Sequence, residues 1–419
     1  MNALKIVNLV ITIVFMLCYT HQFLYVPVPW LRKEGPSKNK EGGGKIHVFA
    51  VLICARNEET VIGDLIDSIK RQTYPMEHVH VFVMADNCTD RTATVSASHG
   101  AKVYFRHDRQ FVGKGYALDA LLKALKEDYP MGFDAYLVLD ADNLLDPGYI
   151  EAMNKKFSEG HDIITSYRNS KNFGDNWISA GYALWFLRES RYLNHARYLL
   201  GSSCAVSGTG FLFSKKIADE MEGWPYHTLT EDIEFSIAQI VKGRRIAFCK
   251  DAVLYDEQPT EFRQSWRQRM RWSKGYLQVF GLYGRDLLKG ISKGNFSCFD
   301  MSANIMPAFI LSVISIVSNI SLGIWGALIG DDMMIALRSF GQLFVSMYSV
   351  LFLLGTITTI SEWRQIHASA AKKILYTLTF PLFMFTYIPI AFSSLFCKGE
   401  WKPIRHCVTA KMCRQLMSK

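Results

Sequence analysis

Residues 134–142 read DAYLVLDAD, and this stretch gives the clearest indication of the fold. An apolar run from Ala135 to Leu139 has the length of one buried strand, and two carboxylates, Asp140 and Asp142, follow it. Strands that are apolar on both faces are typical of parallel sheets covered by helices. Ligands of such sheets bind beyond the carboxyl ends of the strands. Asp140 and Asp142 are therefore candidate ligand-binding residues.

The chain around this stretch alternates between strands and helices. Short β-branched runs at 45–56, 78–86 and 101–105 are separated by runs with helical apolar spacing, and YALDALLKALKED at 116–128 is strongly amphipathic. This alternation predicts an α/β domain with a mostly parallel sheet. Polar residues at the ends of the first strands are further site candidates: Arg56, Glu58 and Asp86.

Three motifs could carry chemistry, each with an ordinary alternative. Asp140 and Asp142 could share Mg²⁺ or Mn²⁺ with a phosphate ligand, or form a solvated strand end. Lys114 lies between two glycines before a helix. This position favours phosphate binding, and the alternative is an ordinary loop. HTLTEDIEFS at 227–236 puts Glu231 and Asp232 in a first helical turn, where acidic residues also occur for dipole reasons. Thr228 or Thr230 would cap that helix.

Long apolar stretches flank the polar middle of the chain. Residues 303–330, 339–361 and 374–397 contain no Asp, Glu, Lys or Arg, and each exceeds the roughly 20 residues that cross a bilayer as a helix. A fourth stretch, 6–28, lacks a small-residue cleavage site, which favours a retained anchor over a signal peptide. Pro381 and Pro389 leave open whether 374–397 crosses straight through or bends.

Charge gives the expected orientation. The net charge is +9, and five of the six Lys and Arg residues before residue 46 follow the first apolar stretch. The positive-inside tendency therefore predicts that the polar domain is cytosolic and that the N-terminus lies outside. With the apolar stretches, we expect a multi-pass protein of the plasma membrane. The nine cysteines show no metal-binding spacing, which is consistent with a reducing compartment.

A cationic, aromatic strip precedes the apolar stretches. Residues 267–275 read RQRMRWSKG, with four Lys or Arg residues around Trp272. This strip could bind lipid headgroups, nucleic acid or a phosphorylated substrate. No recognised nucleic-acid module accompanies it, so a nucleic-acid partner is not expected. The interleaved apolar residues between Arg263 and Lys293 predict amphipathic helices at the cytosolic membrane surface.

Seven motifs follow one another along the chain: ARNEE, MADNCTD, GKGYAL, LDADN, SGTGF, TEDIEF and QRMRW. From about Ile46 to Lys274 the chain thereby resembles the membrane-integrated, processive family 2 glycosyltransferases, such as the cellulose, hyaluronan, chitin, poly-N-acetylglucosamine and mixed-linkage β-glucan synthases. The resemblance implies a GT-A nucleotide-sugar domain that polymerises UDP-glucose or UDP-N-acetylglucosamine by an inverting single displacement. It also implies export of the β-linked glycan through the transmembrane bundle. The alternative is a non-processive enzyme with a polyprenyl-phosphate or lipid acceptor.

The resemblance assigns roles to the motif residues. The donor would be contacted by Ala55, Arg56, Glu58, Asp86, Lys114, Asp140, Gln268 and Arg271. Mg²⁺ or Mn²⁺ would be held by Asp142 and Asp140. Asp232 would be the general base, with Glu231 and Thr230 beside it. The acceptor would be contacted by Trp272, Gly208 and Thr209.

The same reasoning divides the chain into an N-terminal anchor (1–30), a linker (31–45), a GT-A domain (46–260), interface helices (261–300), transmembrane segments (301–397) and a basic tail (398–419). The implied partners are a UDP-sugar, the growing polysaccharide and membrane lipid. The chain has fewer apolar segments than cellulose synthase, which leaves room for an accessory membrane subunit. The tail sequence WKPIRH at 401–406 could return to cap the active site or could be solvated.

Overall fold

A computed structural model of the chain describes residues 2–35, 45–306, 333–396 and 406, together with 314–315, 317–321, 324–325 and 328. Three expectations fall largely outside these residues: the linker, most of the apolar stretch 303–330, and the basic tail apart from His406.

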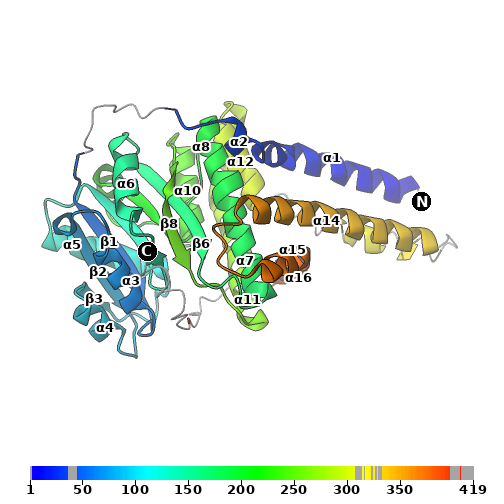
Figure 1. Cartoon of the computed structure of the whole chain (residues 1–419). Coiled ribbons are helices and arrows are strands. Elements are labelled where there is room, and N and C mark those ends of the chain that lie inside the picture. The colour runs from blue at the N-terminus through cyan, green and yellow to red at the C-terminus, as the bar shows by residue number, and fades with distance from the viewer. Residues whose placement is uncertain are drawn as a thin grey trace.

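An eight-stranded sheet forms the centre of the α/β unit, in the order β3-β2-β1-β4-β7-β6-β8-β5 (Figure 1). The strands are β1 (Phe49–Ala55), β2 (Val79–Asp86), β3 (Lys102–Arg106), β4 (Ala135–Asp140), β5 (Leu144–Leu145), β6 (Ile163–Ser170), β7 (Phe211–Ser214) and β8 (Ala247–Asp256). The first four strands of the order β3-β2-β1-β4 run parallel, as do β6 and β8. β7 is antiparallel to β4 and β6, and β5 is antiparallel to β8. The predicted mostly parallel sheet is confirmed.

Helices cover both faces of this sheet. They are α3 (Ile62–Lys70), α4 (Thr92–Ser98), α5 (Lys114–Asp128), α6 (Tyr149–Ser158), α7 (Trp177–Arg188), α8 (His195–Leu200), α9 (Lys215–Met221) and α10 (Glu231–Val241), with the short elements η1 (Met76–His78) and η2 (Glu189–Asn194). Successive residues of β1 enter different cores because strand side chains alternate between faces. Leu52 lies in one cluster with Leu121 of α5, whereas Ile53 lies in another with Leu65 of α3.

The strand register brings the polar strand ends together. β1 pairs with β4 so that Cys54 lies opposite Asp140, and with β2 so that Ala55 lies opposite Ala85. The chain turns immediately after these strands at Asn57 and Asn87, whose φ angles are 59° and 53°. Asn tolerates this left-handed conformation better than most residues. The loops after β1, β2 and β4 therefore open onto one edge of the sheet.

Two further helices follow the last long strand of the sheet. α11 (Phe262–Ser292) is one continuous helix of 31 residues, and α12 (Phe296–Ile305) packs against it. α11 also approaches the start of α10 closely. A Cβ atom on Gly275 would lie 2.4 Å from Thr230 Oγ1, so only glycine fits there.

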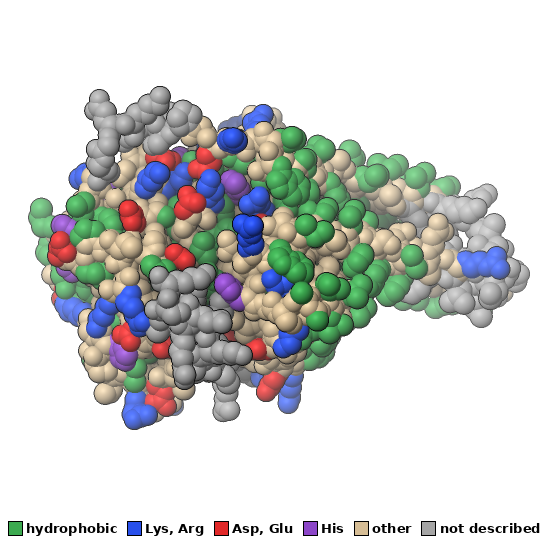
Figure 2. Space-filling model, in the orientation of Figure 1, with side chains coloured by type: hydrophobic (Ala, Val, Ile, Leu, Met, Phe, Trp, Pro, Cys, Tyr) green, Lys and Arg blue, Asp and Glu red, His purple; other side chains and the backbone are tan. Residues whose placement is uncertain are grey.

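Three segments of the described residues are long and apolar enough to cross a membrane: Leu9–Leu31, Phe344–Ser361 and Ala370–Phe396. They belong to α1 (Asn2–Tyr25) with α2 (Val28–Leu31), to α14 (Met333–Ser361), and to α15 (Ala370–Phe385) with α16 (Tyr387–Phe396). The helices α1 and α14 project from the same side of the α/β unit (Figure 1). Apolar side chains cover this projecting part, whereas charged side chains gather over the α/β unit (Figure 2). The stretch 374–397 is not one straight helix, because Pro381 lies inside α15 and the chain breaks at Thr386.

A buried ion pair ties the N-terminal helix to the rest of the molecule. Arg197 of α8 donates from Nε and Nη2 to the Asp300 carboxylate of α12, at 2.8 and 2.9 Å. Tyr25 of α1 donates its hydroxyl to the same carboxylate at 2.7 Å, and His21 Nε2 lies 3.1 Å from it. Removing one partner of such a pair would leave a buried charge uncompensated. The pair therefore fixes α1 against the α/β unit.

Candidate active site

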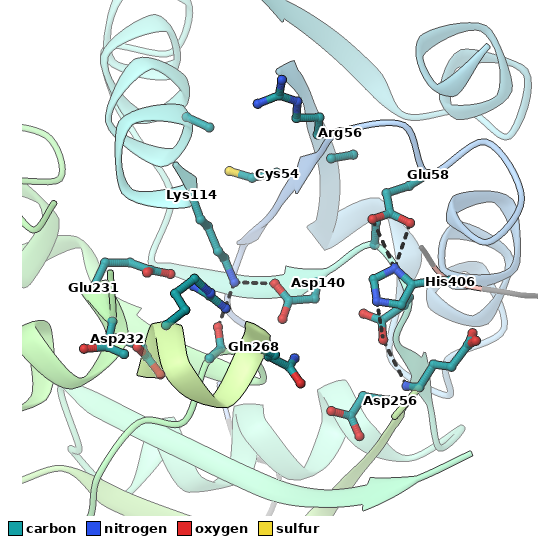
Figure 3. Close-up of a pocket in the computed structure, with 18 of the residues that line it drawn as sticks. Cys54, Arg56, Glu58, Lys114, Asp140, Glu231, Asp232, Asp256, Gln268 and His406 are labelled. Carbon is teal, nitrogen blue, oxygen red and sulfur yellow. Dashed lines mark hydrogen bonds and ion pairs between the residues drawn. The ribbon is translucent and has the colours of Figure 1, made fainter. Parts of the chain in front are cut away.

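A pocket lies at the carboxyl edge of β1, β2 and β4, where α10 and α11 close it (Figure 3). Nearly all the residues predicted for the site line it: Ala55, Arg56, Glu58, Asp86, Lys114, Asp140, Asp142, Gly208, Thr230, Glu231, Asp232, Gln268, Arg271 and Trp272. His406, from the tail sequence that could return to cap the site, lines it as well. Residues that the sequence did not single out also line it, among them Arg168, Asp256, Glu257 and Gln258.

One end of the pocket is built from the loops after β1 and β2. Arg106 of β3 donates from Nη1 to the Asp86 carboxylate at 2.7 Å, which fixes that side chain. Asn57 Oδ1 accepts the backbone N–H of Thr89 at 2.8 Å, so the two loops are tied together. The Asp86 carboxylate is thus held in place at the pocket wall.

Lys114 stands at the centre of the pocket (Figure 3). It begins α5 after Gly113, whose φ is 145°. Its Nζ donates to Asp140 Oδ1 and to the Gly208 carbonyl oxygen, the latter at 2.7 Å. Burial opposes the charged ammonium, but the carboxylates of Asp140 and Glu231 raise its pKa above the ordinary value. The pocket therefore contains a fixed, charged ammonium.

The Asp142 carboxylate lies beside His406. Asp142 Oδ2 accepts the backbone N–H of Glu257 at 2.9 Å and lies 3.9 Å from His406 Nε2. The other ring nitrogen of His406 lies 2.9 Å from Glu58 Oε2. Burial opposes ionisation of Asp142, but the charge of His406 lowers its pKa overall. Burial also opposes the imidazolium, yet Asp142 and Glu58 raise the pKa of His406 to about 10.

The acidic side of the pocket suits a divalent cation. Asp256 is buried near Asp142 and Asp140, and burial together with these neighbours raises its pKa. An excess of buried carboxylates is a donor set that a hard cation satisfies. Asp142 and Asp140 could hold Mg²⁺ or Mn²⁺. The described residues contain no preformed cluster of three or more acidic, His or Cys side chains in metal-binding geometry.

The opposite end of the pocket holds Glu231 and Asp232 at the start of α10 (Figure 3). Asp232 accepts backbone N–H groups of Ile233 and Gly208, and Lys114 and Arg271 act on it. Burial nevertheless raises the pKa of Asp232, and burial with the charge of Asp232 raises the pKa of Glu231 to about 7. Carboxylates whose pKa is raised in this way are suited to accept a proton near neutral pH.

Three side chains of α11 close the pocket. Arg271 Nη1 donates to the Leu229 carbonyl oxygen at 2.9 Å, which fixes the loop before α10. Gln268 Oε1 is buried and has no hydrogen-bond partner among the described residues, so a ligand could supply one. Trp272 packs edge-on against Tyr182 and Phe186 of α7, with ring centroids 5.8 and 6.2 Å away. Trp272 also lines the pocket.

Three predicted threonines behave differently from expectation. Thr209 does not line the pocket: it is 4% exposed, and its hydroxyl bonds to the Asp140 backbone N–H and to Asn143. It therefore positions Asp140 and does not face an acceptor. The expected side-chain cap from Thr228 or Thr230 is wrong, because Thr230 makes no capping bond. Instead Glu234 accepts the Thr228 backbone N–H at 2.9 Å.

The additional pocket residues carried a weaker signal in the sequence. Asp256, Glu257 and Gln258 follow the apolar end of β8, so the strand-end argument applied to 134–142 could have found them. Arg168 lies within β6 and donates from Nε to Asp256 at 2.6 Å and from Nη1 to the Ser207 carbonyl at 2.9 Å. A lone arginine in a strand carries no motif, and only the fold brings it here.

Comparison with known proteins supports this picture. Residues 47–275 match the family described as glycosyltransferase like family 2. A beta-monoglucosyldiacylglycerol synthase of Nostoc sp. is 25% identical over 285 residues, which cover 66% of this chain and 59% of that protein. A poly-beta-1,6-N-acetyl-D-glucosamine synthase of Staphylococcus aureus is 24% identical over 234 residues, or 54% of each chain. The chain thus spans less than two thirds of the length of these relatives.

A solved structure shares the fold. A mannosyltransferase from Pyrobaculum calidifontis, solved in complex with GDP-Man and Mn²⁺, superposes with a TM-score of 0.60 at 15% identity. The match covers 94% of this chain and 99% of that chain. The α/β unit is therefore GT-A-like.

Proposed function

The chain belongs to glycosyltransferase family 2, and we propose that it is a processive, inverting member that polymerises UDP-glucose or UDP-N-acetylglucosamine into a β-linked polysaccharide. One observation carries this proposal. A carboxylate suited to act as a base, Asp232, shares a pocket with Lys114, Arg271 and the aromatic face of Trp272. Relatives that are named as sugar-transferring synthases support transferase activity.

The donor would occupy the end of the pocket near Asp86 and Asp140. Arg271 and Lys114 are both positioned to face a diphosphate, and a guanidinium can bind one through paired hydrogen bonds. A divalent ion held by Asp142 and Asp140 would neutralise further charge on the leaving group.

The acceptor would enter from the side of Trp272. Asp232 would take the proton of an acceptor hydroxyl, whose oxygen forms a bond to the anomeric carbon as the bond to UDP breaks. UDP leaves with the electron pair of that bond. Because we assign one base and no covalent nucleophile, one displacement would turn an α-linked donor into a β-linked product.

Processivity is supported by the surroundings of Trp272. An aromatic cluster leads from the pocket wall to α15 and α16, and it includes Tyr182, Phe186, Phe383 and Tyr387. Aromatic faces bind the apolar faces of sugar rings without fixing a single register. The rings of Tyr182, Phe186 and Phe383 are buried, so they would hold the Trp272 indole in place at the pocket wall, while a growing glycan would pass Trp272 towards the membrane helices.

A lipid acceptor is the second candidate. It is favoured by the match to beta-monoglucosyldiacylglycerol synthase, which extends over more of this chain than the match to the polysaccharide synthase. In that case the aromatic cluster would receive a lipid-linked hydroxyl from the bilayer, and one sugar would be transferred.

The proposal includes the topology of the chain in the membrane. Residues 46–260 would form the cytosolic catalytic domain and residues 261–300 the interface segment. The anchor (1–30) and the segments within 301–397 would cross the plasma membrane several times. Membrane lipid would surround these segments, and an accessory membrane subunit could complete the export path.

The decisive experiment uses the purified full chain with individual radiolabelled UDP-sugars and Mn²⁺. We expect one donor to give a high-molecular-weight product that a β-specific glycosidase degrades. The Asp232→Asn variant is the control and should give none. A product that extracts into organic solvent and carries one sugar would favour the lipid acceptor instead.

A further inference from the structure

An ion pair between two strands lines the active-site pocket. It joins Arg168 of β6 to Asp256 at the end of β8. Arg168 Nε donates to Asp256 Oδ2 at 2.6 Å, and Nη2 pairs with the same oxygen. The Arg168 side chain is 16% exposed, whereas the Asp256 side chain is 3% exposed. The pair therefore presents mainly its guanidinium to the pocket.

Further contacts hold this guanidinium in one orientation. Its Nη1 donates to the Ser207 carbonyl oxygen at 2.9 Å and lies 3.5 Å from the Ser207 hydroxyl oxygen. The Phe186 ring packs against the guanidinium at 3.6 Å, and the backbone N–H of Arg168 donates to the Ser190 hydroxyl at 3.1 Å. A guanidinium has five N–H groups, and these contacts with the ion pair use at most four of them. At least one N–H group is left for a ligand.

The guanidinium borders the space where the reaction would take place. A Cβ atom built on Gly208 would lie 3.8 Å from Arg168 Nη1 and 4.0 Å from both Asp140 Oδ2 and Asp232 Oδ2. Asp140 is on the side proposed for the leaving group, and Asp232 is the proposed base (Figure 3). In a single displacement the transferred sugar lies between the leaving group and the attacking hydroxyl. The sugar would therefore lie within reach of Arg168.

Charge balance distinguishes Arg168 from the other arginine that the site uses. Arg271 donates to the Leu229 carbonyl oxygen and forms no ion pair with a described residue, so its charge is available to a diphosphate. Arg168 is neutralised by a buried carboxylate, so it attracts a phosphate less strongly. Its N–H groups can still donate to hydroxyl oxygens, which are acceptors of a neutral sugar.

We propose that Arg168 recognises the sugar of the donor: its guanidinium donates a hydrogen bond to a hydroxyl group of the transferred hexose. Asp256 and Phe186 hold the guanidinium in the required position. This inference rests on the proposed function and deepens it, because it assigns the choice among UDP-sugars partly to β6 and β8.

The test separates binding of the sugar from binding of the nucleotide. Arg168→Lys keeps the charge beside Asp256 but loses the planar fork of N–H groups. The matched control is Arg191→Lys, because Arg191 pairs with the buried Glu362 and neither residue lines the pocket. Each variant is made in the full chain together with Asp232→Asn, which stops turnover. Titration calorimetry in Mn²⁺ then gives the Kd of UDP and the Kd of the UDP-sugar that the wild type uses.

We expect Arg168→Lys to weaken binding of the UDP-sugar about tenfold, because a hydrogen bond from a fixed guanidinium is lost. The Kd of UDP should stay within about twofold of the value for Asp232→Asn alone, since the diphosphate contacts remain. Arg191→Lys should change neither Kd. If Arg168→Lys does not fold, Asp256→Asn takes its place, because it keeps the arginine but loosens its position and should also weaken binding of the UDP-sugar selectively.

Donor analogues that each lack one hydroxyl group of the hexose extend the test. A site that binds a hydroxyl group rejects the analogue that lacks it. One analogue should therefore bind Asp232→Asn about tenfold more weakly than the complete UDP-sugar does, and it should bind the Arg168→Lys double variant as well as the complete donor does.

Four results would overturn the inference. They are an unchanged Kd of the UDP-sugar, an equal loss of UDP and UDP-sugar binding, discrimination against every analogue that survives in Arg168→Lys, and unfolding of both Arg168→Lys and Asp256→Asn but not of Arg191→Lys. The second would place Arg168 at the diphosphate or the metal, and the last would mark the pair as structural. A wild-type chain that releases UDP from no nucleotide sugar would instead overturn the proposed function, and this inference with it.

Discussion

The two ends of the pocket hold carboxylates whose pKa values are shifted in opposite directions. At one end His406 lowers the pKa of Asp142, even though burial opposes this. At the other end burial raises the pKa of Asp232, although Lys114 and Arg271 lie close by. The same side chain is thereby kept as an anion in one place and made a better proton acceptor in the other. Burial and the neighbouring charges, and not the residue type, therefore determine which carboxylate binds a ligand and which accepts a proton.

The two ends also differ in how the chain builds them. The Asp86 and Asp140 end is made of loops that directly follow parallel strands. The Asp232 end needs α10 and α11 to meet, which depends on Gly275 against Thr230, and it is backed by an aromatic cluster that reaches α15. If the ends have separate roles, mutations at each should damage different steps.

The largest effect is expected from Asp232→Asn. The amide keeps the shape but cannot take a proton, so turnover should fall by about 100- to 10,000-fold. The measurement is the rate of UDP release with saturating donor and acceptor. Retention of most of the wild-type rate would move the base elsewhere, with Glu231 as the first alternative.

Asp142→Ala should weaken donor binding and should leave proton transfer unaffected. We expect about 100-fold weaker UDP binding in Mn²⁺, equivalent to about 2.7 kcal/mol. With the metal chelated, the variant and the wild type should bind UDP alike. Titration calorimetry with and without chelator makes this comparison, and equal losses in both conditions would remove Asp142 from the metal site.

Trp272→Ala should give a smaller effect, confined to the acceptor. Loss of some tens of Å² of apolar contact, at about 25 cal/mol per Å², weakens acceptor binding by roughly 1 kcal/mol, or about five- to tenfold. The polymer should shorten, as measured by size-exclusion chromatography, while donor hydrolysis continues. Arg271→Ala is the matched variant one residue away and should damage donor use instead. Polymer of unchanged length from Trp272→Ala would favour the lipid acceptor.

The smallest effect concerns pH. The pair of Glu231 and Asp232 takes up a proton more readily than ordinary carboxyl groups, since the Glu231 pKa is about 7 and that of Asp232 is raised. Activity requires the unprotonated base, so it should fall as the pH drops through the raised pKa of Asp232. Glu231→Gln removes one of two interacting charges and should move this acidic limb to lower pH. An unchanged acidic limb in Glu231→Gln would mean that protonation of this pair does not limit the rate.

The donor end was largely predictable because it is local. Asp140 and Asp142 follow an apolar strand, and the position of a strand end fixes the sheet edge on which they lie. The amphipathic pattern of α5 likewise predicted the helix that begins at Lys114. These features depend on short-range periodicity, which the sequence records directly.

The contacts that tune the site were not predictable in the same way. His406 meets Glu58 and Asp142 across most of the chain length, and no periodicity encodes that approach. Thr209 belongs to a recognisable motif, yet its hydroxyl turns towards the Asp140 backbone and away from the pocket. Arg168 reaches Asp256 and the Ser207 carbonyl only because β6 pairs with β8 in the folded sheet.

The most direct test of separate roles is UDP binding in Mn²⁺ by the wild type, Asp232→Asn and Asp142→Ala, measured by titration calorimetry. We predict that Asp232→Asn binds UDP as tightly as the wild type although it transfers no sugar, and that Asp142→Ala loses the metal-dependent part of the affinity. Loss of UDP binding in Asp232→Asn, with normal binding in Asp142→Ala, would contradict the division of the pocket.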